Sequence, residues 1–290
     1  MAVNSKQFEE KQWRKPLRYL KEDVYVALGK GLHSAGFLKG YPNQPVFIIG
    51  SPRSGTSIFN KMIAECEDVA NFSEAIYIWS PGDKDPECDH VKGASDATDE
   101  EARRIKGAFG FYQFSRRKRI FVNKCPRSSV RLPFIEAIFP EAKYIHVYRD
   151  GRAVVSSILD LIEREPFRQS IPLGAFCKPA DWRELVKMEP LVRHACQWRD
   201  IMQTIREDSG AIDKKQWLDV SYEEFCRKPG ETMSSVFEFM GARPGKEQIR
   251  NIENMPQKND QKWRQRFSDE EIASMNEIMG QQLRAYNYDL

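Results

Sequence analysis

The sequence has no long hydrophobic run. Its longest uninterrupted apolar stretches have five residues, Val24 to Leu28 and Ala75 to Trp79, whereas a helix that spans a bilayer needs about 20. Charged residues interrupt every apolar stretch near the N-terminus, so the hydrophobic segment of a secretory signal is missing as well. We therefore expect no membrane span, and the sequence predicts a cytoplasmic protein.

Closely spaced metal ligands are also missing. No two of the six cysteines lie nearer than nineteen residues in the sequence, and no two of the four histidines have the i, i+4 spacing of a helical zinc site. We therefore predict no metal site, and we expect the cysteines to be free, buried thiols.

An excess of one charge is absent too. The chain has 45 Lys+Arg against 42 Asp+Glu, a formal net charge of +3, with 41% hydrophobic residues. This composition is typical of an ordinary globular protein. One short basic run, Arg116 to Arg119, ends a predicted helix, where cations complement the helix dipole. We expect no nucleic-acid partner.

From Pro45 onward, the sequence contains short apolar runs that alternate with longer amphipathic stretches. This pattern predicts strands and helices that take turns, and hence a mostly parallel sheet with helices on both faces. The predicted fold class is α/β, with a three-layer α/β/α architecture. The predicted strands are Val46 to Ile49, Val69 to Phe72, Ile120 to Asn123, Tyr144 to Tyr148 and Trp217 to Val220.

We interpret the 290 residues as a single domain. Residues 1–42 are predicted to be a helical extension packed on its outside. The stretches 80–99 and 165–181 are too long and too polar for simple connections, and loops of this kind in a compact domain are often functional lids. We expect both to cover a substrate. His90, within the first stretch, is expected to be a solvated loop residue.

A glycine-bearing loop, Gly50 to Ser57, follows the first predicted strand and leads into an amphipathic helix. Strand, loop and helix N-terminus together predict a phosphate cradle built from backbone N–H groups. Both glycines and the final hydroxyl match the loop of nucleotide triphosphatases, but Thr56 stands where those enzymes have a lysine that reaches the β- and γ-phosphates. We therefore expect one phosphate-like group, held with the help of Arg53, in place of a triphosphate with magnesium.

A second element of this kind follows the strand Tyr144 to Tyr148. Arg149 stands at the strand end, and Ser157 lies eight residues further on, within the next helix. An arginine at the strand end and a hydroxyl in the following helix can bind one further phosphate. Two anion cradles at one edge of a sheet predict a ligand with phosphate-type groups at opposite ends.

These two loops, together with Lys262, Trp263 and Arg264, resemble the sulfotransferases that use 3′-phosphoadenosine 5′-phosphosulfate (PAPS). The resemblance extends over roughly residues 45–288. Within that family, the tyrosylprotein or carbohydrate sulfotransferase-like branch looks most similar, and this likeness rests on Asn123 to Pro126, on Phe139, Pro140, Ala142 and Lys143, and on Arg149 to Ala153. The resemblance implies the sulfotransferase fold, which is similar to that of P-loop nucleoside triphosphate hydrolases, and it implies PAPS as co-substrate.

The resemblance also implies roles for individual residues. The family pattern assigns the 5′-phosphosulfate to Arg53, Ser54, Gly55, Thr56 and Ser57, the 3′-phosphate to Arg149 and Ser157, the adenine to Tyr222, and a further clamp on the 3′-phosphate to Lys258. The sequence departs from the family at Ile58, where cytosolic members have a tryptophan that stacks on adenine. It also lacks the usual arginine and glycine near Lys258.

Sulfuryl transfer needs cations where charge develops on the bridging oxygen, and a base that takes the proton of the acceptor. Arg53 and Lys124 are the predicted cations, since Lys124 stands near the end of an internal strand. No histidine follows Lys124, as one does in small-molecule members. The resemblance to the tyrosylprotein branch instead implies Glu74 as the base. His146, in the middle of a strand, is expected to be a core residue.

Three functions stay open at this point. The first is a sulfotransferase that moves the sulfuryl group of PAPS to a hydroxyl, or less favourably an amine, of a small molecule, glycan or peptide. The second is a nucleotide or small-molecule kinase with a degenerate loop, and the third is a non-catalytic protein that binds adenosine bisphosphate. We expect the first, with PAPS, its product adenosine 3′,5′-bisphosphate (PAP) and an acceptor as ligands. The sequence leaves open whether the chain forms a homodimer.

Overall fold

The computed structural model describes residues 20–43, 45–255 and 261–290. Its centre is a five-stranded sheet in the order β2-β3-β1-β4-β5, in which every neighbouring pair is parallel. The strands are β1 (Pro45–Ile49), β2 (Val69–Asn71), β3 (Ile120–Lys124), β4 (Lys143–Tyr148) and β5 (Trp217–Ser221). All five predicted strands are therefore present, and each predicted end lies within one residue of the observed one.

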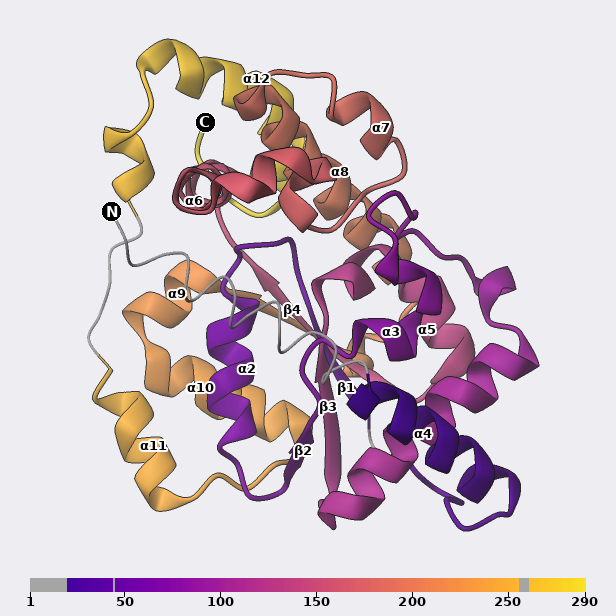
Figure 1. The fold of residues 1–290 in the computed structure, drawn as a ribbon. Helices are drawn as coiled ribbons and strands as arrows, with labels where there is room; N and C mark the ends of the chain where they lie inside the picture. The colour runs from indigo at the N-terminus through magenta and orange to yellow at the C-terminus, as the bar shows by residue number, and fades with distance from the viewer. Residues whose placement is uncertain (1–19, 44, 256–260) are drawn as a thin grey trace, which may run out of the picture.

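Helices cover both faces of the sheet (Figure 1). One face carries α2 (Thr56–Ala64), α9 (Tyr222–Arg227), α10 (Pro229–Met240) and α11 (Lys246–Glu253). The other carries α3 (Ile76–Trp79), α4 (Asp99–Arg116), α5 (Leu132–Ile138), α6 (Gly151–Arg164), α8 (Pro190–Ser209) and α12 (Asp269–Ala285), with α7 (Trp182–Leu185) packed on α8. The predicted three-layer α/β/α architecture is confirmed.

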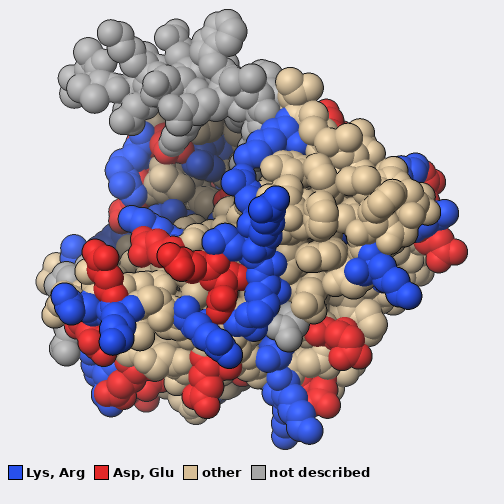
Figure 2. Space-filling view, turned by 90° about the horizontal axis from the view of Figure 1, so that it is seen from below, with Lys and Arg blue, Asp and Glu red and all other residues tan. Residues whose placement is uncertain are grey.

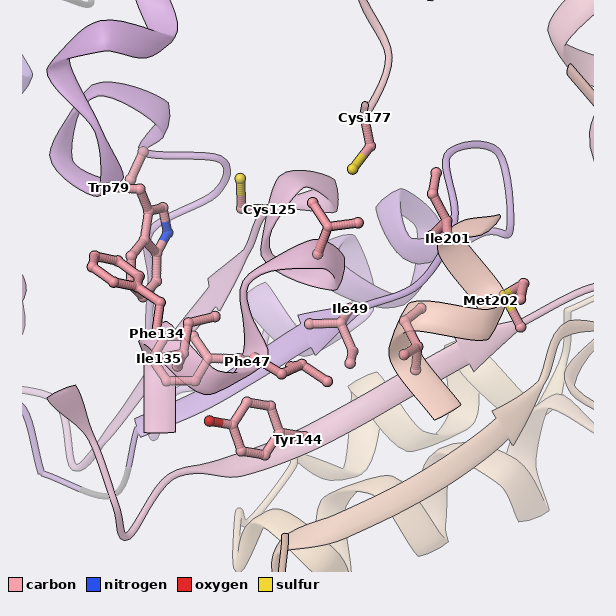
Figure 3. Close-up of a cluster of buried hydrophobic side chains, with 14 of the residues drawn as sticks. Phe47, Ile49, Trp79, Cys125, Phe134, Ile135, Tyr144, Cys177, Ile201 and Met202 are labelled. Carbon is pink, nitrogen blue, oxygen red and sulfur yellow. The ribbon is translucent and has the colours of Figure 1, made fainter. Parts of the chain in front are cut away.

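Strand β1 shows why the strands read as continuous apolar runs. Val46 and Ile48 pack into the core beneath α2 and α10, whereas Phe47 and Ile49 pack into the core on the opposite face. Figure 3 shows part of this second core, in which Phe47 lies near Tyr144 of β4 and Ile201 of α8 belongs to the same cluster. Because both faces are buried, no position along the strand needs to be polar.

Within the predicted extension at 1–42, residues 20–34 form a helix, while residues 1–19 lie outside the described part of the chain. None of the helices in the described ranges is long and apolar enough to cross a bilayer. On the face seen in Figure 2, a band of Lys and Arg lies between groups of Asp and Glu. Charges of both signs thus share this surface, in keeping with the 45 Lys+Arg and 42 Asp+Glu of the sequence.

The sheet topology brings one end of the strands together around β1. The chain runs from β1 outward to β2, returns through β3, and then crosses to β4 and β5 on the other side of β1. In such sheets the crevice at the carboxyl ends, where the strand order reverses, is the usual ligand site. Four segments that carry predicted site residues leave from this edge: the loops after β1, β2 and β4, and the start of α9 after β5.

Candidate active site

The loop between β1 and α2 is held in an open, anion-accepting shape. The Ser129 hydroxyl accepts a hydrogen bond from the Gly50 N–H and donates one to the Gly50 carbonyl, both at 2.9 Å. The hydroxyls of Ser51 and Ser54 are 2.7 Å apart inside the loop. Helix α2 then starts at Thr56, and its first N–H groups have no acceptor within the helix. The loop therefore presents a ready site for an anion.

Gly55 permits a close approach by the side chain of Tyr222. Its φ is 94°, and a Cβ atom there would lie 2.3 Å from Cδ2 of Tyr222. Tyr222 comes directly after β5, so the phosphate loop and the start of α9 touch at this residue. The ring of Tyr222 also lies 4.7 Å below the guanidinium of Arg149. The residue predicted to contact adenine is thus in contact with both loops.

The two predicted anion cradles meet at Arg53. Its Nε atom donates to the Ser157 hydroxyl at 3.1 Å, and its carbonyl accepts from Nη1 of Arg149 at 2.9 Å. Asp150 caps α6 by accepting from the N–H of Arg152 at 2.9 Å, which fixes the turn that carries Arg149. The structure therefore brings Arg53, Arg149 and Ser157 together at one edge of the sheet.

Positive charge gathers around this contact. Burial lowers the pKa of Arg53, and the guanidinium groups of Arg149, Arg164 and Arg168 lower it further, while Glu165 acts in the opposite direction. Cations that depress one another's pKa gain stability when an anion is placed among them. The local field therefore favours a ligand of high negative charge.

Glu74 and Lys124 form an ion pair beside the phosphate loop. Nζ of Lys124 lies 2.9 Å from Oε1 of Glu74 and 3.4 Å from the hydroxyl of Ser57. The Lys124 side chain is only 4% exposed, whereas that of Glu74 is 37% exposed. The backbone fixes the pair as well, because the Glu74 N–H donates to the Lys124 carbonyl at 2.6 Å. A carboxylate that solvent can reach and a buried ammonium thus stand together at the end of β3.

Two features of the structure could not be predicted from the sequence. Ser129, which clamps Gly50, lies 79 residues from it in the chain, and no local pattern reveals that contact. The prediction that His90 is solvated is wrong. Its side chain is buried, and burial, helped by Arg127, Arg131 and Lys178, lowers its pKa to about 2. His146 is a buried residue of β4, as predicted, and its Nδ1 lies 2.8 Å from Asp219.

The segments 80–99 and 165–181 are joined to each other. The Lys178 N–H donates to Nδ1 of His90 at 3.0 Å, and its ammonium donates to the carbonyl of Cys88 at 2.9 Å. The indole of Trp182, just after the second segment, donates to Asp89 at 2.8 Å. Figure 3 shows that Cys177, from the second segment, points into the core near Cys125 at the end of β3. The two segments therefore act as one anchored unit.

The remaining predictions concern the clamp and the metal. Lys258 lies outside the described residues. In the tail, Trp263 is buried, and the guanidinium groups of Arg152 and Arg264 each lie 4.5 Å from its ring. Among the residues that the structure describes, no group of three or more His, Cys, Asp or Glu side chains is arranged to hold a metal ion. All six cysteines are free, and Cys88 alone among them is partly exposed.

Comparisons with known proteins agree on one family. A model described as "Sulfotransferase family" matches residues 45–246. Protein-tyrosine sulfotransferase A of Caenorhabditis elegans is 25% identical over 207 residues, covering 67% of this chain and 49% of that protein. Protein-tyrosine sulfotransferase 2 of Gallus gallus is 22% identical over 205 residues, covering 68% of this chain and 50% of that protein. The chain thus spans about half the length of these two relatives.

Among solved structures, a sulfotransferase domain from the curacin biosynthetic pathway superposes with a TM-score of 0.56 at 15% sequence identity. The match covers 84% of this chain and 98% of that domain. A sulfotransferase domain from the Synechococcus PCC 7002 olefin synthase gives a TM-score of 0.55 at 18% identity, covering 85% and 95% of the two chains. Both matches concern the fold.

Proposed function

This chain belongs to the sulfotransferase family, and we propose that it transfers the sulfuryl group of PAPS to a hydroxyl of an acceptor. The resemblance to the PAPS-dependent family, close to the tyrosylprotein branch, is confirmed. The observation that carries the proposal is the Glu74–Lys124 pair, at 2.9 Å, beside a phosphate loop that has no lysine. A kinase loop of this type needs that lysine for its triphosphate, whereas a sulfuryl donor needs a base and a cation beside the loop.

In this proposal three residues, Glu74, Lys124 and Arg53, act on the reacting atoms. The hydroxyl oxygen of the acceptor attacks the sulfur in line, while the bond between sulfur and the bridging phosphate oxygen breaks. Glu74 takes the proton of the acceptor hydroxyl, because its carboxylate is the part of the pair that solvent reaches. Lys124 and Arg53 stabilise the negative charge that develops on the leaving oxygen.

The rest of the site binds the nucleotide. Arg53, Ser54, Gly55, Thr56 and Ser57 hold the 5′-phosphosulfate, while Arg149 and Ser157 hold the 3′-phosphate. Tyr222 lies against adenine. Its ring already contacts the phosphate loop at Gly55 and lies below Arg149, so one residue can orient the nucleoside between both phosphate sites. Lys258 stays a predicted member of the same site.

The binding part of the proposal is tested by thermal unfolding with PAP and with ADP, each with and without magnesium. A ligand at 100 times its dissociation constant stabilises the folded state by ~2.7 kcal/mol, which raises the melting temperature by roughly 4–5 °C for a chain of this size. We expect this shift with PAP alone, independent of metal. A larger, magnesium-dependent shift with ADP would instead identify a kinase.

Transfer is then measured with a labelled sulfate donor and an acceptor panel. The panel contains a tyrosyl peptide first, because the curated relatives are named for protein tyrosine, followed by a simple phenol, a sugar and a primary amine. We expect label on a hydroxyl acceptor, in the presence of a chelator, because the proposal assigns no step to a metal. PAP binding without transfer to any acceptor would favour the non-catalytic alternative.

A cytoplasmic location and a homodimer remain separate proposals from the sequence. Fractionation of expressing cells tests the first, and light scattering of the purified chain at several concentrations tests the second.

A further inference from the structure

A single carboxylate, that of Glu223, joins three segments beside the nucleotide site. Its Oε1 atom accepts a hydrogen bond from the Asp150 N–H at 2.9 Å. Its Oε2 atom accepts from the Tyr288 hydroxyl at 2.7 Å and from the Ser221 hydroxyl at 3.1 Å. The three donors come from the turn before α6, from the segment after α12 and from the end of β5.

Each of these segments carries or supports a residue of the proposed nucleotide site. Asp150 directly follows Arg149, and Glu223 directly follows Tyr222. Because Arg149 lies over the ring of Tyr222, the spacing between the two decides how a nucleoside with a 3′-phosphate fits. The Glu223 carboxylate fixes that spacing, because it binds the backbone N–H of Asp150, the neighbour of Arg149, and is itself the neighbour of Tyr222.

Tyr288 is itself held firmly in its place. Its N–H donates to the carbonyl of Leu283 at 2.9 Å, and its ring lies 6.3 Å from that of Tyr148 at the end of β4. Burial raises the pKa of Tyr288, and the neighbouring charge of Glu223 raises it further, so the hydroxyl stays protonated and remains a donor. The carboxylate thus has a permanent partner that is 65 residues away in the sequence.

We propose that Glu223 and Tyr288 are positioning residues that set the Arg149–Tyr222 geometry and thereby favour nucleotides with a 3′-phosphate over those without one. The inference rests on the proposed function, because it assumes that Arg149 faces the 3′-phosphate. Neither side chain takes part in the transfer. Their effect is on selectivity for the donor, and it reaches the ligand through the turn at Asp150.

The test compares PAP with adenosine 5′-monophosphate (AMP) by titration calorimetry on the full chain. In Tyr288→Phe, the ring stays and only the hydroxyl that bonds to Glu223 is lost. We expect PAP affinity to fall about tenfold, which corresponds to ~1.4 kcal/mol and is close to the lower end of the range for hydrogen bonds to charged groups. AMP affinity is expected to stay within a factor of two, and turnover at saturating PAPS is expected to stay unchanged.

Two further variants make the test specific. Glu223→Gln changes the carboxylate itself at nearly constant shape, and we expect the same selective loss of PAP affinity. Tyr286→Phe is the matched control, because it removes a hydroxyl from the same segment. The ring of Tyr286 also packs on Tyr148, with the ring centroids 4.9 Å apart. This control should bind PAP and AMP as the unchanged protein does.

The possible results separate the two proposals. Equal affinity for PAP in Tyr288→Phe and the unchanged chain overturns the positioning role and leaves the sulfotransferase assignment intact. Equal losses for PAP and AMP, with a lower melting temperature, also overturn it, because they indicate a purely structural contact. Failure of the unchanged chain to bind PAP overturns the proposed function and, with it, this inference.

Discussion

The replacement Glu74→Gln tests the proposed base directly. Glutamine has nearly the shape of glutamate and keeps an oxygen that can accept the 2.9 Å hydrogen bond from Lys124, but it cannot take a proton from an acceptor. General-base catalysis typically increases the reaction rate about 10²–10⁴-fold. We therefore expect kcat to fall by this factor, equivalent to ~2.7–5.4 kcal/mol in the activation free energy.

The structure predicts that little else changes in this variant. The Glu74 side chain is 37% exposed, so solvent screens its ion pair with Lys124, and the loss of the pair should lower the free energy of unfolding by ~1 kcal/mol or less. The melting temperature should then move by no more than about 2 °C. PAP affinity should stay nearly unchanged, because the nucleotide contacts are assigned to other residues.

The assay combines single-turnover transfer from a labelled donor with calorimetric PAP binding. Glu65→Gln is the matched control, because Glu65 is an exposed glutamate just after α2 and the proposed chemistry gives it no role. A kcat within about fivefold of the unchanged chain would refute the base assignment, since such a change is too small for lost general-base catalysis. A parallel loss of PAP binding would point to a structural role for Glu74.

Three further predictions concern the loops and the buried histidine. Gly55→Ala places a Cβ atom 2.3 Å from the Tyr222 ring at a φ of 94°, and it should lower the free energy of unfolding by ~1–3 kcal/mol and weaken PAP binding, both measured by denaturation and calorimetry. Arg149→Gln should weaken PAP by ~1.5–3 kcal/mol and leave AMP unaffected in the same titration. The pKa of His90 is about 2 in the folded protein and ~6.5 in the unfolded chain. Below pH ~6.5 the unfolded chain therefore binds a proton that the folded protein does not, and the free energy of unfolding decreases as the pH falls. Between pH 6.5 and 5 the loss should be ~2 kcal/mol, and urea denaturation of His90→Gln should show a flatter pH profile; an unchanged profile would contradict the burial of a neutral imidazole.

The strands and the two anion loops could be predicted from the sequence because their signals are local. A buried parallel strand is a short apolar run bounded by turn residues, as Val46 to Ile49 before Gly50 shows. The phosphate loop needs glycines at fixed spacing, and the second loop places Arg149 and Ser157 eight residues apart. Patterns of this kind need only neighbours in the chain.

The missed features depend on partners far away in the sequence. Nothing near His90 indicates burial, because its partner Lys178 is 88 residues away. Ser129 reads as one more hydroxyl in a turn until the fold places it against Gly50. Glu223 likewise reads as an ordinary first-turn glutamate of a helix. A single sequence gives no signal for such contacts, since they arise only when the sheet is assembled.

Two of the proposed site residues also have a strained backbone. Arg53 and Glu74 have φ values of 69° and 67°, in the left-handed region that costs a residue with a side chain roughly 1–2 kcal/mol. Glycine would adopt this region without strain, so folding alone does not favour an arginine at position 53. Residues that retain strain of this kind cluster at functional sites.

We expect opposite effects on stability and on function for Arg53→Gly. The change relieves the strained backbone and removes a cation that Arg149, Arg164 and Arg168 repel, while glycine adds ~0.5–1 kcal/mol of unfolded-chain entropy. We expect the ligand-free melting temperature to stay constant or rise by up to about 3 °C, while the PAP-induced shift and sulfuryl transfer are lost. A fall of several degrees would show that Arg53 serves mainly the fold, since a residue kept for binding trades stability for activity.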